Sequence, residues 1–248
     1  MLLYKAWRES SMRFLIGAGV ITALCLMYAL LHKQFYPGIA HEHAGVRNYL
    51  QYIHWTVFGG IVRGMMQLSC LLLGLGGLQR DRRQNTLGFT LALPVSRFGL
   101  VASRAVLGLM QVLALAVIPT LVLPAASHLV GQQLPFDYAM RFIPLWFAGG
   151  SFTFAISFLA SALFASEYVS LAVAYVTYIF YLAAVRHPVF RRVPLHVADL
   201  MSGVFPHYLD RVTMLWSGSY ALLPIAGFLA AAAVLVLLSN LIVRRQDL

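Results

Sequence analysis

Six long apolar stretches dominate the chain and limit what it can fold into. Each holds roughly 18 or more mostly uncharged residues, enough at a helical rise of about 1.5 Å per residue to cross a hydrocarbon layer about 30 Å thick. The runs are continuous rather than alternating, so they predict helices and not the strands of a membrane barrel. The predicted spans cover residues 14–31, 55–78, 105–123, 142–165, 168–185 and 220–243.

The composition excludes the other broad classes of protein. Of the 248 residues, 60% are hydrophobic and only 10% are charged, which is too much apolar surface for a water-soluble domain to bury. Disordered chains are poor in the aromatic and branched aliphatic residues that are abundant here. We therefore expect an all-α membrane protein, with a single transmembrane domain over residues 1–248.

The basic residues predict the orientation of the chain. With the N-terminus in the cytoplasm, the inner segments carry ten lysines and arginines and the outer segments seven, with Arg63 left inside a span. This bias favours both termini on the cytoplasmic side. The formal charge is +10, but no basic segment with interleaved aromatic residues is present. We therefore expect the basic residues to contact anionic lipid rather than nucleic acid.

The most informative segment lies between the second and third spans. It begins with charged residues and continues as a short amphipathic turn of helix, which Asn85 and Thr86 can cap and which should end before Pro94. A charged, short helix along the inner membrane face suits the docking of another protein. The residues expected to make that contact are Asp81, Arg82, Arg83, Gln84, Asn85, Thr86, Leu87, Phe89, Leu91, Leu93 and Pro94.

This segment resembles the type-2 permease family of ATP-binding-cassette transporters. Members commonly carry, at the same place, a charged stretch followed by a pattern like Glu-x-Gly-Thr-Leu-x-x-Leu-Leu-Ala-x-Pro-Val-Ser-Arg. Asn85 stands where glycine is usual, and asparagine is among the residues that best tolerate positive φ. The resemblance extends to the six spans and to the long outer segment before the last span. The matching residues are Thr86, Leu87, Leu91, Ala92, Pro94, Val95, Ser96 and Arg97.

The resemblance implies a function and a set of partners. It implies an exporter permease in a prokaryotic cell membrane that moves an amphiphilic or hydrophobic substrate, such as a drug, antibiotic, peptide or lipid. The inner segment would be a coupling helix seated on a separate ATPase subunit, and a second permease copy or a related permease would complete the transport path. ATP and Mg²⁺ would bind the ATPase subunit, and this chain would bind no cofactor of its own.

The missing motifs agree with a subunit that is not itself an enzyme. Neither of the two lysines, Lys5 and Lys33, ends a glycine-bearing phosphate loop. An intramembrane enzyme is one alternative, but it would need several polar groups within the spans. A secondary transporter built on inverted repeats is the other, although the two halves of the chain differ in loop length and polarity.

Three smaller features carry hypotheses of their own. Arg63 is the candidate for the substrate path, because a charge inside a membrane usually faces a cavity or a partner. His41 and His43, two residues apart, could ligate zinc or copper together with other outer histidines, but isolated loop histidines are common and we assign no metal site. The outer segment 186–219 is too polar to span, and we expect re-entrant or interfacial short helices within it.

Overall fold

The computed structural model describes residues 2–42, 46–75, 97–164, 166–185, 187, 196–203 and 222–245. Every regular element among them is a helix, and six helical segments are long and apolar enough to cross a membrane. The prediction of an all-helical chain with six apolar helices is therefore confirmed. These segments are Leu3–Leu30, Tyr49–Gly74, Gly99–Leu129, Phe136–Leu163, Glu167–Val185 and Leu222–Arg245.

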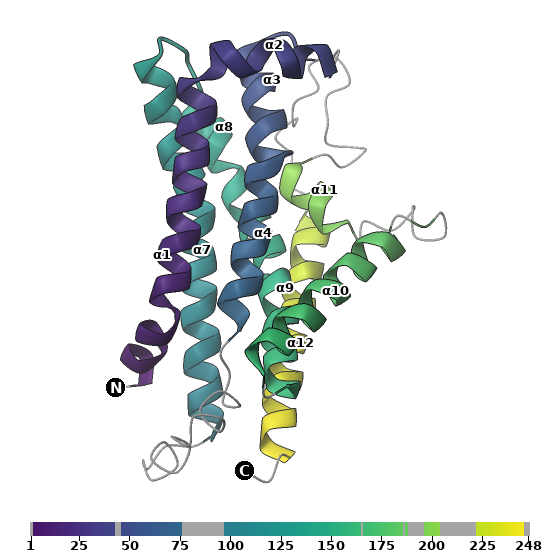
Figure 1. The fold of residues 1–248 in the computed structure, drawn as a ribbon. Coiled ribbons are helices and arrows are strands. Elements are labelled where there is room, and N and C mark those ends of the chain that lie inside the picture. Colours follow the sequence, from purple (N-terminus) through teal and green to yellow (C-terminus); the bar gives the residue numbers. More distant parts are fainter. Residues whose placement is uncertain are drawn as a thin grey trace.

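Some of these segments consist of more than one helix, because the second and fourth are interrupted. Helix α1 begins and α12 ends at the same end of the bundle, as an even number of crossings requires (Figure 1). The elements are α1 (Leu2–Leu30), α2 (His32–Glu42), α3 (Tyr49–Ile53), η1 (His54–Phe58), α4 (Ile61–Gly74), α7 (Arg97–Leu129), α8 (Phe136–Met140), α9 (Phe142–Leu163), α10 (Glu167–Val185), α11 (Val197–Ser202) and α12 (Leu222–Arg245).

Helix α9 is the centre of the bundle. It packs against α4, α7, α10, α11 and α12, and the segment that contains it, Phe136–Leu163, is far more deeply buried than the last segment, Leu222–Arg245. Small residues allow this close packing, since a Cβ on Gly74 would lie 2.5 Å from the carbonyl oxygen of Phe154. One buried polar contact crosses the same interface, from the Ser157 hydroxyl to the carbonyl of Leu71 at 2.5 Å. Small and hydroxyl-bearing residues are how helices in lipid approach one another.

The helices extend beyond the predicted apolar runs. Helix α1 begins at Leu2, well before residue 14, and its first turns carry charged side chains, including Lys5 and Glu9 in an i,i+4 ion pair of 3.9 Å. Hydropathy marks only the part of a helix that needs hydrocarbon around it, whereas the helical backbone continues wherever its hydrogen bonds are satisfied. The ends of helices therefore escape a prediction based on apolar length.

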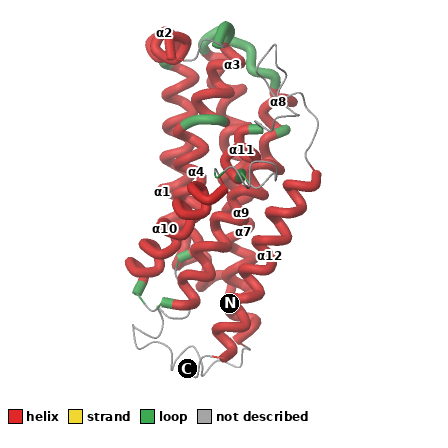
Figure 2. Tube along the Cα trace, turned by 90° about the vertical axis from the view of Figure 1, so that its right-hand side faces the viewer, coloured by secondary structure: helices red, strands yellow, loops and turns green. Residues whose placement is uncertain are grey.

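Helix α2 runs across the bundle instead of along it. It is separated from α1 by one residue and lies over the end opposite both termini (Figures 1 and 2). Its Tyr36 and Ile39 pack against the buried core, while Lys33 and Phe35 are exposed. This arrangement is typical of a helix at an interface between apolar and polar surroundings.

Several predicted features fall outside the described residues. The inner segment from Asp81 to Pro94 is one of them, and His43 is another. Of the outer segment, the structure describes residue 187 and residues 196–203, which include the short helix α11.

Candidate functional site

The second span is interrupted one helical turn before Arg63. Helix α3 continues into the π-helical turn η1, the chain bends at Gly59 and Gly60, and α4 begins at Ile61. Single π-helical turns inside helices are rare and occur often at functional sites. In a membrane protein, such a break is tolerated where neighbouring elements cover it or where it borders a cavity.

Gly60 is required by the close approach of the chain to itself. A Cβ at this position would lie 2.5 Å from the carbonyl oxygen of Thr56 and 2.7 Å from that of Trp55. Both atoms belong to the backbone, so no side-chain rotation could relieve the contact. The break in the second span therefore depends on a residue without a side chain.

Arg63, in the first turn of α4 after the break, binds helix α11. Its Nη1 donates a hydrogen bond of 2.9 Å to the carbonyl oxygen of Ala198, in the first turn of α11. The side chain is half-buried and comes from one turn after the break. The sequence singled out Arg63 as a candidate for the substrate path, which stays a prediction, and the partner found for it is a backbone carbonyl.

Three further side chains hold α11 against the spans. Trp146 of α9 donates its indole N–H to the carbonyl of Met201 at 2.9 Å, and Gln67 of α4 lies 3.4 Å from the Met201 sulfur. Tyr181 of α10 accepts a hydrogen bond of 3.3 Å from the backbone N–H of Val197. Helix α11 ends at Gly203, whose φ of 69° lies in the left-handed region that favours glycine. Polar groups from three spans therefore fix this six-residue helix.

The depth of α11 follows from its contacts with α9. Met201 packs on Gly149, where a Cβ would lie 2.5 Å from the Met201 Cγ. Trp146 and Gly149 are four and seven residues from the start of α9 at Phe142, or roughly 6 to 10 Å along the helix. Helix α11 therefore lies alongside the apolar spans rather than beyond their ends, as Figure 1 also shows.

An aromatic cluster backs the π-helical turn. Phe58 stacks on Phe142 with ring centroids 3.9 Å apart, and Trp146 meets Phe58 edge-on at 5.9 Å. Buried among these rings, His54 shares a hydrogen bond of 2.8 Å between its Nδ1 and the Tyr138 hydroxyl. Its Nε2 has no hydrogen-bond partner among the described residues. This aromatic cluster therefore contains one buried imidazole, and Trp146 connects the cluster to α11.

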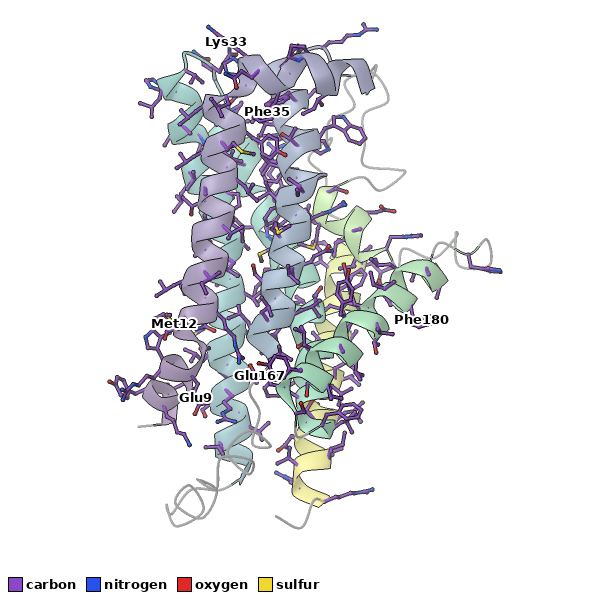
Figure 3. All side chains as sticks on the ribbon, in the orientation of Figure 1. Glu9, Met12, Lys33, Phe35, Glu167 and Phe180 are labelled. Carbon is purple, nitrogen blue, oxygen red and sulfur yellow. The ribbon has the colours of Figure 1, made fainter. Side chains whose placement is uncertain are left out.

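A second polar cluster lies at the end of the bundle where the termini are. Arg13 of α1 forms an ion pair with Glu167, the first residue of α10. The same guanidinium donates to the carbonyl of Leu75 at 2.6 Å and, at 3.4 Å, to that of Leu72. Since the last carbonyls of a helix lack intrahelical partners, Arg13 caps the end of α4. Figure 3 shows Glu167 and Glu9 toward this end of the bundle.

The same cluster extends to α7. Glu9 accepts a hydrogen bond of 2.8 Å from Arg104, and Gln111 donates to the Ser10 hydroxyl at 2.8 Å. Arg104 is largely buried, with 9% of its side chain exposed. Helix α1 is therefore tied to both flanks of the segment 76–96: to Leu75 just before it and to Arg104 shortly after it.

The described residues offer no candidate metal site. Among the residues that the structure describes, no group of three His, Cys, Asp or Glu side chains lies close enough to share a metal ion. His43 and the side chain of His41 are not among them. The two residues stay an untested pair.

Sequence reasoning missed most of these contacts. Arg13 is only one of the ten basic residues assigned to the inner segments, and no prediction from the sequence involves His54. Their partners lie far along the chain, since Arg13 and Leu75 are 62 positions apart and His54 and Tyr138 are 84. One available signal was the Gly59–Gly60 pair in an otherwise apolar span, because adjacent glycines are a recurrent cause of helix breaks.

The fold and these clusters define a multi-pass α-helical membrane protein. Its second span is broken, and a short helix is held against it by polar side chains. Searches of protein-family models, curated proteins and solved structures found no match to this chain.

Proposed function

We propose that this chain is the membrane-spanning permease subunit of an ATP-driven exporter in a prokaryotic cell membrane. A separate ATPase subunit docks on the inner segment around Asp81–Pro94, and a second permease, identical or related, completes the path. The substrate is an amphiphilic or hydrophobic molecule that leaves the cytoplasm or the inner leaflet. The chain makes no covalent bonds itself and holds neither ATP nor Mg²⁺.

The observation that carries this proposal is the cluster around Arg13. A segment that receives motion from a motor protein must be mechanically connected to the spans that respond. Arg13 connects Leu75, which immediately precedes segment 76–96, to α1 and α10. Glu9 connects α1 to Arg104, which follows that segment. A shift of the inner segment is thereby transmitted to four spans together, which supports a coupling role.

The charge bias of the loops supports an inner position for this cluster. Both termini lie at the end of the bundle that holds Arg13, and the basic residues favour that end as the cytoplasmic one. With this orientation, α11 belongs to the outer segment and is a re-entrant helix that enters the membrane from the outer side. Arg63 holds it, so Arg63 controls the outer part of the path.

The experiment that tests the proposal is affinity purification of the chain from its native membrane. We expect an ATPase with a phosphate-binding loop to copurify and to be lost from a variant carrying both Leu87→Ala and Leu93→Ala. The control is Leu129→Ala, which truncates one leucine side chain that is 77% exposed at the opposite end. Equal recovery of the ATPase with all three proteins, or no ATPase with any of them, contradicts the proposal.

A secondary transporter is the alternative that one observation favours. Discontinuous spans with polar groups at the break are typical of transporters driven by ion gradients. The two functions differ in their energy source. Export that continues in vesicles without nucleotide and stops when the ion gradient collapses would support the alternative.

A further inference from the structure

A basic pocket opens at the end of the bundle opposite both termini. It lies between α2, the residues that lead into α3, and the turn between α7 and α8. Lys33 and Arg47 provide two cationic side chains on its walls, and both residues are exposed. None of the described residues that line it is acidic, so the pocket has a positive potential that attracts anions.

The floor of the pocket is held rigidly by the protein itself. Asn48 and Gln51 form a reciprocal capping box: the Asn48 side chain accepts from the Gln51 backbone N–H at 2.9 Å. The Gln51 side chain accepts from the backbone N–H groups of Arg47 and Asn48, at 2.6 and 3.2 Å. These bonds fix the backbone that carries Arg47, so little ordering of that backbone is needed when a ligand binds.

A second set of contacts fixes the neighbouring rings. The Tyr49 hydroxyl shares a hydrogen bond of 2.8 Å with Ser127 of α7, and His32 meets the Tyr49 ring edge-on at 5.4 Å. His32 is only 9% exposed, and its Nδ1 has no hydrogen-bond partner among the described residues. A buried polar atom without a partner is costly, which is a second, independent sign that a polar ligand belongs here.

The position of the pocket narrows the class of ligand. Helix α2, which forms one wall, crosses the end of the bundle (Figure 1), and both Lys33 and Phe35 on it are exposed (Figure 3). Aromatic and basic residues at the end of an apolar bundle are typical of the head-group layer of a membrane. The anion present in that layer at high local concentration is phosphate. Paired Lys and Arg side chains are ordinary ligands of phosphate groups.

We propose that the pocket formed by His32, Lys33, Arg47 and Tyr49 binds a phosphate group. The group comes either from the head group of a phospholipid or from a soluble phosphate-bearing molecule. Lys33 and Arg47 supply the charge, and His32 and the neutral polar residues of the floor supply further hydrogen bonds. This site does not depend on the proposed transport function. Its residues lie at the end of the bundle opposite the cluster around Arg13, on which that function rests.

The test uses the full chain purified in neutral detergent, with two probes. Phosphatidylglycerol is titrated and counted by native mass spectrometry, with diacylglycerol as the same apolar body without phosphate, and inorganic phosphate is titrated by calorimetry. We expect saturable phosphatidylglycerol binding that weakens about five-fold in Lys33→Gln or Arg47→Gln and about thirty-fold in the double variant. Diacylglycerol should not saturate.

The matched control is Arg141→Gln, which removes one positive charge at the same end of the bundle but outside the pocket. It should change affinity by less than about two-fold. Saturable binding of inorganic phosphate that the double variant loses would identify a soluble source, and binding of the lipid alone would identify a head group. The proposal is overturned if neither probe saturates, if the double variant binds like the wild type, or if Arg141→Gln weakens binding as much as Arg47→Gln. Gel filtration and helical circular dichroism check that each variant is folded.

Discussion

Arg63 and Ala198 are joined by a hydrogen bond of 2.9 Å between a guanidinium and a backbone carbonyl, across 135 positions of sequence. This bond connects the broken second span to helix α11. It joins the sequence-based candidate for the substrate path to an element of the outer segment. The stability of α11 should therefore depend on Arg63.

Replacing Arg63 with alanine should loosen α11 without unfolding the bundle. A hydrogen bond from a charged group contributes about 1.5 to 3 kcal/mol, so amide exchange of residues 197–202 should become roughly ten- to hundred-fold faster. Arg63→Lys should restore part of the protection because the ammonium also donates. Hydrogen exchange measured by mass spectrometry checks this, with Arg141→Ala as the control. Unchanged exchange of α11 in Arg63→Ala contradicts the assignment.

Adding one methyl group at Gly149 should displace α11 from its seat. The new Cβ would lie 2.5 Å from the buried Met201 Cγ, and overpacking of this kind costs about 1 to 3 kcal/mol. We expect a lower midpoint of thermal unfolding for Gly149→Ala, recovered in part when Met201→Ala is added. Gly64→Ala is the matched control, since nothing lies within 4 Å of its Cβ and alanine favours helix. Equal stability of Gly149→Ala and Gly64→Ala would show that α11 does not pack as described.

The break in the second span should tolerate alanine at Gly59 but not at Gly60. At Gly59 the nearest atoms to a new Cβ are 3.4 Å away, whereas at Gly60 a carbonyl oxygen lies at 2.5 Å. The backbone around Gly60 must therefore shift, at a cost on the order of 1 to 3 kcal/mol. Thermal unfolding of the two variants in the same detergent measures the difference. A Gly60→Ala protein as stable as Gly59→Ala contradicts the geometry of the break.

Arg13 should matter more than its ion-pair partner. Arg13 caps two carbonyls of α4 in addition to contacting Glu167, whereas the Glu167 side chain is 35% exposed and its ion pair is partly screened. We expect Arg13→Ala to destabilise by about 1.5 to 3 kcal/mol and Glu167→Ala by about 1 kcal/mol or less.

The charge-reversed pair gives the control for this prediction. Combining Arg13→Glu with Glu167→Arg restores opposite charges but removes the hydrogen bonds that Arg13 donates to the carbonyls of Leu72 and Leu75, because a carboxylate only accepts. Chemical denaturation should therefore show little recovery relative to Arg13→Glu alone. Full recovery would mean that the ion pair, and not the cap, is what stabilises this end of the bundle.

The number and type of the spans could be predicted because hydrocarbon length sets them directly. The apolar run at 105–123, for example, lies wholly inside α7 (Arg97–Leu129). The contacts of the two polar clusters could not be predicted in this way. Arg63 was noticed because a charge in a span is rare. Its hydrogen-bond acceptor is the backbone carbonyl oxygen of Ala198, and no pattern of residue types marks a backbone acceptor.

The ends and breaks of the helices escaped prediction for a related reason. The π-helical turn at His54–Phe58 depends on packing against Phe142 and Trp146, which belong to a distant part of the chain. The position of α11 depends likewise on Gly149. Local hydropathy reports the surroundings of a residue only on average, so features that depend on one tertiary contact do not appear in it.

The measurement that tests the coupling claim most directly is site-specific photocrosslinking in the native membrane. A photoreactive phenylalanine analogue is placed at Phe89, within the predicted coupling segment, and at Phe35, which is exposed on α2 at the opposite end. We predict that position 89, and not position 35, crosslinks to an ATPase with a phosphate-binding loop, in a yield that changes when nucleotide is added. No such adduct at position 89, or the same adduct at both positions, would contradict it.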